Sequence, residues 1–261
     1  MPDPLPLLVS ERLKNARFAH GFSTRAGGVS VAPYDSLDFA ILREPEALRE
    51  NQRRLAAAVG FDPARLYQAK QVHGPALLVA EGDPRAMLEK EADALVAHPG
   101  SRAAVAVRVA DCVPVLLADP ATGRVAAVHA GWRGVVADVI GEAVRQLAGD
   151  ASVAGKAGDA GGFLAAIGPS IGACCFEVGA DVGETIVRAT TTDAIARRDD
   201  ARGKVFVDLR AGVRAQLRAL GLADDAIEDV PGCTRCDAAR FYSYRRDGDA
   251  SGRLVGVIVA R

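Results

Sequence analysis

A cysteine and a histidine lie at the ends of two consecutive apolar runs. These runs, 113–118 and 124–129, flank a short segment rich in turn residues, so we expect them to form a β-hairpin. Pairing about this turn gives opposed residues whose numbers sum to 242 or 243. Cys112 then lies across from residue 130 or 131 and next to His129, at the open end of the hairpin.

A thiol beside an imidazole supports more than one chemistry. The imidazole can lower the thiol pKa and create a nucleophile, as in cysteine hydrolases. Alternatively, both groups can bind one metal ion, and catalytic zinc sites use three such protein ligands and one open position. A third interpretation is structural, with Cys112 a buried apolar side chain and His129 a core histidine with satisfied hydrogen bonds. Asp111 and Arg133 flank the same end of the hairpin, which makes it polar.

A metal site requires a third ligand. His73, which precedes a Gly-Pro pair, is a candidate because a loop side chain can project there. His20 and His98 are equally isolated in the sequence, and spacing alone gives no reason to prefer His73 over them.

Other common enzyme motifs lack support. The segment Gly149–Lys156 is similar to a phosphate-binding loop, but five residues separate its glycines instead of four. Ala157 also stands where such a loop has serine or threonine. The sequence has no G-x-G-x-x-G motif after a strand, no G-x-S-x-G elbow and no H-E-x-x-H motif. These absences leave the cysteines and histidines as the main source of chemistry.

The spacing of apolar residues predicts the elements that position these side chains. We expect helices at 45–59, 135–147, 178–189 and 209–220. We expect strands at 76–80, 92–97, 103–109, 113–118, 124–129, 163–167, 204–207 and 254–259. Helices and strands do not alternate strictly, which favours an α+β fold with a mixed sheet over a doubly wound parallel sheet.

The chain is expected to form one domain over residues 1–261. Two segments near 149–162 and 190–203 are polar or rich in small residues, and we expect mobile surface loops there. Strand patterns resume directly after each segment, so neither has the character of a domain linker.

Composition excludes several classes of protein. The 32 basic and 33 acidic residues give a net charge of −1, so there is no basic field to attract nucleic acid. Charged residues interrupt the first twenty positions, and no apolar run is long enough to span a membrane. The five cysteines are an odd number, which fits reduced thiols. We therefore expect a cytoplasmic protein without membrane or nucleic-acid partners.

The segments that contain the candidate residues resemble those of the laccase-domain (YfiH-type) family. Members of this family are variously named polyphenol oxidase, purine nucleoside phosphorylase and peptidoglycan editing factor. The resemblance rests on seven segments in family order: HGFSTRAGGVS, KQVHG, EADALVA, ADCVPVLLAD, VHAGWRG, AIGPSIGACCFEV and FYSYRRDG. They extend over nearly the whole chain, which makes a chance match very improbable.

The resemblance implies a single α+β domain in which mixed β-sheets are sandwiched between helices. It also implies one zinc ion, because the family's ligand positions fall on His73, Cys112 and His129. The implied activities are phosphorolysis of adenosine, inosine, guanosine and methylthioadenosine, and deamination of adenosine. The partners would be a purine nucleoside and phosphate, and the sequence leaves the oligomeric state open.

Several further residues are candidates to act on such a substrate. Arg25 and Arg133 could bind phosphate in bidentate fashion. Ser23 and Gln71 could form hydrogen bonds with ribose or base, and Asn51 is a further candidate for substrate binding. Asp111 could act as a general acid or base, or could only orient a metal ligand, which we slightly prefer.

Two alternative functions attach to the same family. One is a cytoplasmic amidase that edits peptidoglycan precursors, using zinc or a Cys112-His129 pair. The other is a copper-dependent polyphenol oxidase, which composition disfavours because four histidines cannot build a multicopper cluster. A non-catalytic metal-binding domain is disfavoured because three ligands leave a position open for chemistry.

The remaining four cysteines form two close pairs, Cys174-Cys175 and Cys233-x-x-Cys236. The second pair would need the first to complete a metal site, and adjacent cysteines chelate one metal poorly. We therefore expect Cys233 and Cys236 to be ordinary thiols near the wall of the site.

Overall fold

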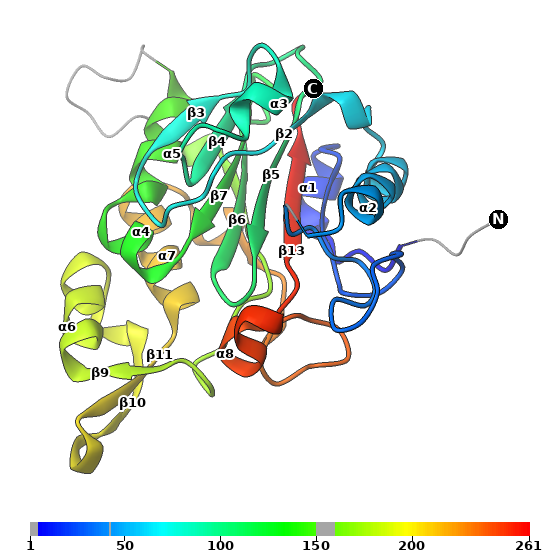
Figure 1. The fold of residues 1–261 in the computed structure, drawn as a ribbon. Coiled ribbons are helices and arrows are strands. Elements are labelled where there is room, and N and C mark those ends of the chain that lie inside the picture. The colour runs from blue at the N-terminus through cyan, green and yellow to red at the C-terminus, as the bar shows by residue number, and fades with distance from the viewer. Residues whose placement is uncertain (1–4, 42, 150–159) are drawn as a thin grey trace.

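The computed structural model describes residues 5–41, 43–149 and 160–261, and their strands form three sheets (Figure 1). The six-stranded sheet has the order β12 (Ile227–Asp229), β8 (Leu164–Ile167), β6 (Val113–Ala118), β7 (Val125–Ala130), β4 (Ala94–Ala97) and β3 (Leu77–Val79). The four-stranded sheet has the order β1 (His20–Phe22), β13 (Leu254–Val259), β5 (Ala104–Val109) and β2 (Leu66–Tyr67). The three-stranded sheet has the order β10 (Ile195–Asp199), β11 (Lys204–Val207) and β9 (Glu177–Gly179).

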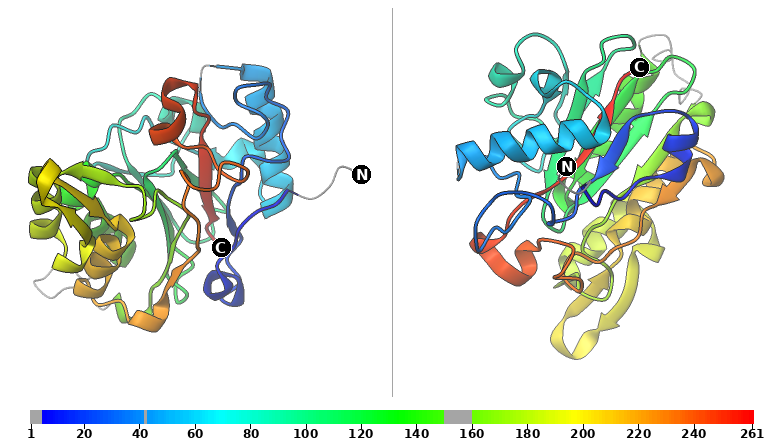
Figure 2. Two further views of the ribbon diagram at one scale, coloured as in Figure 1. Left: turned by 90° about the horizontal axis from the view of Figure 1, so that it is seen from below. Right: turned by 90° about the vertical axis from the view of Figure 1, so that its right-hand side faces the viewer.

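The helices within the described ranges are α1 (Glu11–Asn15), α2 (Pro45–Val59), α3 (Pro84–Met87), α4 (Trp132–Val136), α5 (Val139–Ala148), α6 (Ala180–Ala189), α7 (Leu209–Ala219) and α8 (Tyr244–Asp247). Of these, α2 packs on the outer face of the four-stranded sheet, and α5 and α7 pack on that of the six-stranded sheet. In the left view of Figure 2, α2 lies on one side of the sheets and the green and yellow helices lie on the other. No helix within the described ranges combines the length and apolar character needed to cross a membrane.

The two larger sheets pack face to face because alternate residues of each strand point in opposite directions. On β6, Leu116 and Ala118 face the cluster shared with Val105 and Val107 of β5. The other face of β6, including Val115, packs against apolar residues of α5 and α7. Every residue of β6 and β7 is buried, which is why these strands are continuous apolar runs.

The outer face of the four-stranded sheet packs against α2. Ala104 and Ala106 of β5 share a cluster with Leu55 of this helix. Two sheets therefore lie between two helical layers, and the order of layers confirms the expected α+β architecture with mixed sheets between helices.

Most predicted elements are present with small shifts at their ends. Helix α2 has its predicted bounds, and it ends at Gly60, whose φ of 92° suits a left-handed helix terminus. The helix predicted at 135–147 is instead two helices, α4 and α5, because Asp138 between them has a φ of 65° that interrupts the helix. Sequence analysis missed the short strands β1, β2, β9, β10 and β12, which offer few residues for a periodic pattern.

The two predicted loops have different outcomes. Most of the segment near 149–162, including residues 150–159 and hence most of the Gly149–Lys156 segment, lies outside the described residues. The segment 190–203 is not a simple loop, because residues 195–199 form β10 and pair antiparallel with β11. The charged sequence of β10 lacks the apolar pattern typical of a strand, because the middle residues of β10 are exposed.

Asn51 of α2 holds the segment that leads into this helix. Its side chain is fully buried, and its Oδ1 accepts a hydrogen bond from the backbone N–H of Val29 at 2.9 Å. Its Nδ2 donates to Ser30 Oγ at 3.1 Å and to the carbonyl of Asp38 at 2.9 Å. The amide thus connects three points of a segment that has no regular structure of its own.

We expect Asn51→Ala to lower the free energy of unfolding by about 2–4 kcal/mol, because it leaves buried polar groups without partners. Urea unfolding followed by circular dichroism measures this change. The matched control is Gln52→Ala, which removes an amide from the neighbouring, only partly buried position and should change stability by less than about 0.5 kcal/mol. Equal stability of Asn51→Ala and the wild type would show that this network contributes little.

Candidate metal and anion site

The β6–β7 hairpin brings Cys112 and His129 together in the predicted register. Val113 pairs with Ala130 and Pro114 with His129, so opposed residue numbers sum to 243. Cys112 lies where the chain passes from β5 in the four-stranded sheet to β6 in the six-stranded sheet. The thiol therefore lies at the junction of the two sheets.

His73 completes a group of three metal-binding side chains. It precedes β3 and has a φ of 63°, a left-handed conformation that is uncommon for a residue with a side chain. Its Nε2 lies 3.9 Å from Cys112 Sγ, and its ring lies edge-on to that of His129 with centroids 4.8 Å apart. The donor atoms of the three residues all lie within 4.8 Å of one another.

A buried carboxylate, Asp93, positions both histidines. Its Oδ1 lies 2.7 Å from His129 Nδ1 and also accepts the backbone N–H of His73 at 2.9 Å. Its Oδ2 accepts the backbone N–H groups of Val72 and Gly74 at 3.1 and 2.8 Å. Because Asp93 occupies Nδ1 of His129, the Nε2 atom of that ring is left for a metal.

Asp93 was not among the candidate site residues predicted from the sequence, although it lies in the segment EADALVA. The available signal was a carboxylate inside the strand predicted at 92–97, since a charge buried in a strand requires partners.

The three groups strongly affect one another's protonation. Burial alone would raise the pKa of Cys112, but His129 and His73 lower it to about 6. Burial alone would lower the pKa of His129, but Cys112 and Asp93 raise it to about 9. Although burial acts to raise the pKa of Asp93, the hydrogen bonds from His129 and the backbone lower it. Together these directions favour the thiolate, which is the form of cysteine that binds metals.

The chemistry and spacing of these donors fit one metal ion. Two imidazoles and a thiolate are borderline-soft ligands that suit zinc, and three of them leave a coordination position open. Gly131 keeps the space around them clear, because a Cβ atom there would lie 2.9 Å from His73 Cδ2 and 3.2 Å from Cys112 Sγ. The described site therefore matches a three-ligand metal centre.

A cavity of about 540 Å³ opens beside the three ligands, a volume typical of small-molecule sites. Its walls come from both larger sheets and from the loops that follow β8 and precede β13. They are formed by Gln71, His73, Arg108, Ala110, Asp111, Cys112, His129, Ile171, Phe176, Tyr244, Arg245 and Arg253.

Two arginines, Arg108 and Arg253, make the cavity suitable for an anion. Arg108 donates from Nη2 to the carbonyl of Ala69 at 3.0 Å, whereas its buried Nη1 has no hydrogen-bond partner among the described residues. Burial and the nearby Arg253 lower the pKa of Arg108 to about 10. Burial and Arg43 also lower the pKa of Arg253. Neighbouring guanidinium groups with an unused donor are a setting that a bound anion would stabilise.

Of the predicted substrate-binding residues, the structure brings Gln71 to the cavity. Its side chain exchanges two hydrogen bonds with the backbone of Arg108, at 2.7 and 2.8 Å. Asp111 also lines the cavity, but its carboxylate accepts hydrogen bonds from Thr234 Oγ1 and from the backbone N–H of Arg245, both at 2.6 Å. Both carboxylate oxygens of Asp111 therefore have protein partners, and neither of these contacts is to His73, Cys112 or His129.

The structure does not bring the other candidates to the cavity. Arg25 binds the carbonyls of Asp35 and Ala238 and stacks on Tyr242, away from the metal-binding residues. Arg133 is exposed and lies over the ring of the adjacent Trp132.

Ser23 and Asn51 have structural partners. Ser23 Oγ accepts the backbone N–H of Val255 at 2.9 Å, and Asn51 holds the segment described above. The two remaining histidines also lie elsewhere, since His20 is bound by the Ser10 backbone and His98 pairs with Glu81.

Comparison with known proteins places the chain in a family. A family model described as "Multi-copper polyphenol oxidoreductase laccase" matches residues 19–261. The chain belongs to this laccase family. This membership confirms the resemblance drawn from the seven segments.

Relatives within the laccase family carry a different name from the family itself. A purine nucleoside phosphorylase of Streptomyces coelicolor is 38% identical over 240 residues, covering 91% of this chain and 93% of the relative. A purine nucleoside phosphorylase of Deinococcus radiodurans is 37% identical over 257 residues, covering 97% and 92%. The crystal structure of the hypothetical protein YfiH from Bacillus licheniformis has a TM-score of 0.86 and 26% identity, covering 99% of this chain and 97% of that one.

We expect Asp93→Asn to weaken metal binding at His73 and His129 by about 10- to 100-fold, because it removes the charge that orients both rings. Competition with a chromogenic chelator measures the affinity. Glu91→Gln is the matched control, since Glu91 is an exposed carboxylate two residues away that pairs with Lys70. An unchanged metal affinity in Asp93→Asn would show that the carboxylate does not orient the two imidazole rings for metal binding.

Proposed function

We propose that this laccase-family chain is a zinc-dependent purine nucleoside phosphorylase, with His73, Cys112 and His129 as the metal ligands. The observation that carries the proposal is the presence, in one cavity, of this donor set and of Arg108 with an unused buried donor. The names of the relatives support the same activity. A nucleoside phosphorylase must hold both phosphate and a nucleoside, and this cavity offers a cationic group for the first and room for the second.

Arg108 and Arg253 would bind the phosphate. Both line the cavity, and Arg253 lies close enough to Cys112 for its charge to interact with the thiolate. Phosphate held there would attack C1′ of the ribose, the bond from C1′ to the purine nitrogen would break, and the purine would leave with the bond electrons and take up a proton. The arginines would hold the attacking oxygen in position throughout.

Aromatic side chains would hold the purine. Phe176 and Tyr244 line the cavity, and a purine stacks well on such rings. Zinc bound by the three ligands would supply a Lewis acid for a substrate oxygen or a water molecule. Asp111 would keep the loop of Thr234 and the start of α8 in place at the mouth of the cavity.

We also propose adenosine deamination as a second reaction of the same site. Attack of water on C6 of the purine would release ammonia and give inosine. Copper is a poorer candidate for the metal than zinc, because the chain has four histidines in all and two of them lie away from the site.

The decisive experiment combines metal analysis with product analysis. We expect the purified protein to contain zinc, and to convert adenosine to adenine and ribose 1-phosphate only when phosphate is present. Cys112→Ala should lose the zinc of this site and at least about 100-fold of the rate, because the metal loses its thiolate ligand. His98→Ala, which changes a histidine outside the site, should retain both. Metal without nucleoside turnover in the wild type would contradict the phosphorylase.

We expect Arg108→Gln to raise KM for phosphate by about 10- to 100-fold, because it removes a charge-assisted hydrogen bond. Arg108→Lys should recover part of the loss, since it retains the charge without the paired donors. Steady-state kinetics with varied phosphate measure both effects. Arg25→Gln is the control, because Arg25 was predicted from the sequence to bind phosphate but lies outside the cavity. An equal rise of KM for phosphate in Arg25→Gln would contradict the proposed position of the phosphate beside Arg108.

A further inference from the structure

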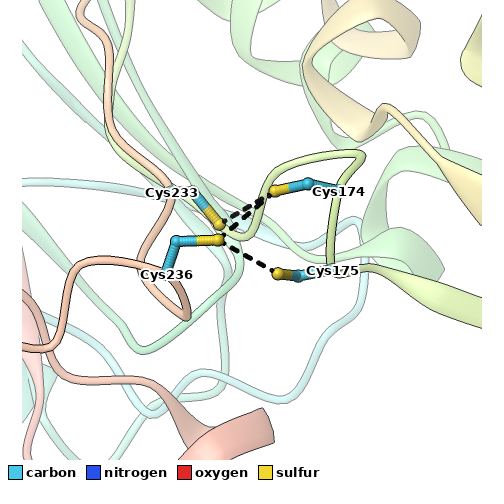
Figure 3. Close-up of side chains that lie close together, drawn as sticks. All are labelled: Cys174, Cys175, Cys233 and Cys236. Carbon is cyan, nitrogen blue, oxygen red and sulfur yellow. Dashed lines mark hydrogen bonds between the residues drawn. The ribbon is translucent and has the colours of Figure 1, made fainter.

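The four cysteines outside the described site converge at a second point of the molecule. Cys174 and Cys175 lie in the loop between β8 and β9, and Cys233 and Cys236 lie in the loop between β12 and α8. Their sulfur atoms all lie within 4.8 Å of one another (Figure 3). The expectation of ordinary thiols did not anticipate this convergence, because adjacent cysteines were taken to be poor ligands of one metal.

The separations between sulfur atoms fit a metal ion. Cys236 Sγ lies 3.3 Å from Cys175 Sγ and 3.5 Å from Cys174 Sγ, and Cys174 Sγ lies 3.6 Å from Cys233 Sγ. Four sulfurs around zinc, each about 2.3 Å from the ion in tetrahedral geometry, are separated from one another by about 3.8 Å. Both members of the adjacent pair thus lie within reach of a sulfur from the facing loop, Cys236 Sγ.

The surroundings are suited to thiolates. The backbone N–H of Gly172 donates to Cys233 Sγ at 3.3 Å, and Arg235 Nη1 donates to Cys175 Sγ at 3.5 Å. Donors of this kind offset the negative charge of a thiolate metal site and orient its ligands. A Cβ atom at position 172 would lie 3.3 Å from Cys174 Sγ, so glycine there leaves room for this close approach.

We propose that Cys174, Cys175, Cys233 and Cys236 bind a second metal ion, a structural zinc. Four thiolates form a closed tetrahedral set, which leaves no position for a substrate and is typical of structural zinc. The proposal is independent of the reaction proposed above, because none of the four residues belongs to the His73, Cys112 and His129 group.

This ion would brace one wall of the cavity. Ile171 and Phe176, which line the cavity, flank the first cysteine pair in sequence. Thr234, which follows Cys233, donates to Asp111, and Asp111 is next to the metal ligand Cys112. A metal ion bound between the two cysteine loops would therefore fix the positions of the cavity residues Ile171 and Phe176, and also the hydrogen bond from Thr234 to Asp111.

Metal analysis of purified variants tests the proposal. The protein is prepared in reducing buffer without chelator, and zinc is measured per chain. We expect about two zinc ions in the wild type, and about one each in Cys174→Ser/Cys236→Ser and in His73→Ala. His98→Ala is the control and should keep about two. Both cysteines of the double variant are exposed, so their replacement removes little packing.

Cobalt provides a readout that does not depend on a variant. Wild-type protein stripped of metal and loaded with cobalt should show the absorption of a tetrahedral tetrathiolate site in addition to that of the site with one thiolate. One zinc per chain that His73→Ala abolishes and the double variant retains would overturn the proposal. Iron with inorganic sulfide, disulfides within the cluster in freshly purified protein, or no tetrathiolate cobalt spectrum would also overturn it.

Discussion

The candidate site depends on one buried carboxylate and the four hydrogen bonds it accepts. Asp93 binds the ring of His129 on β7 and three consecutive backbone N–H groups at residues 72–74. A charge inside the protein is stable only when such partners surround it. The arrangement fixes the left-handed backbone at His73 and the orientation of His129 at the same time, so both imidazoles lie beside the thiol of Cys112.

The sequence was sufficient to predict those parts of the site that are determined by residues close together in the chain. A turn between two apolar runs defines the register of a hairpin, and this register brought Cys112 beside His129. It was insufficient to predict the position of side chains whose hydrogen-bond partners come from distant segments of the chain. Arg25 has the right charge for phosphate, but its partners at Asp35 and Ala238 come from other loops and hold it away from the cavity. Asp93 and the four converging cysteines depend on the pairing of strands and loops that no spacing in the sequence encodes.

The cavity brings groups of opposite charge close enough to interact. A thiolate and two imidazoles form one side, and Arg108 and Arg253 form another. No carboxylate among the described lining residues is free to pair with these arginines, since Asp111 is occupied by Thr234 and Arg245. Such a site gains most from a ligand that carries its own negative charge and also offers neutral polar groups to a metal.

The passage of the chain from β5 to β6 has a mechanical consequence. Arg108 belongs to the four-stranded sheet, whereas His129 belongs to the six-stranded sheet, and Cys112 lies at the crossing between them. The separation between Arg108 and the candidate metal ligands is then set by how closely the two sheets approach. Apolar side chains packed between the sheets, such as Leu116 and Val107, set this separation. A change in their volume would shift Arg108 relative to His129 while leaving each residue in its own sheet.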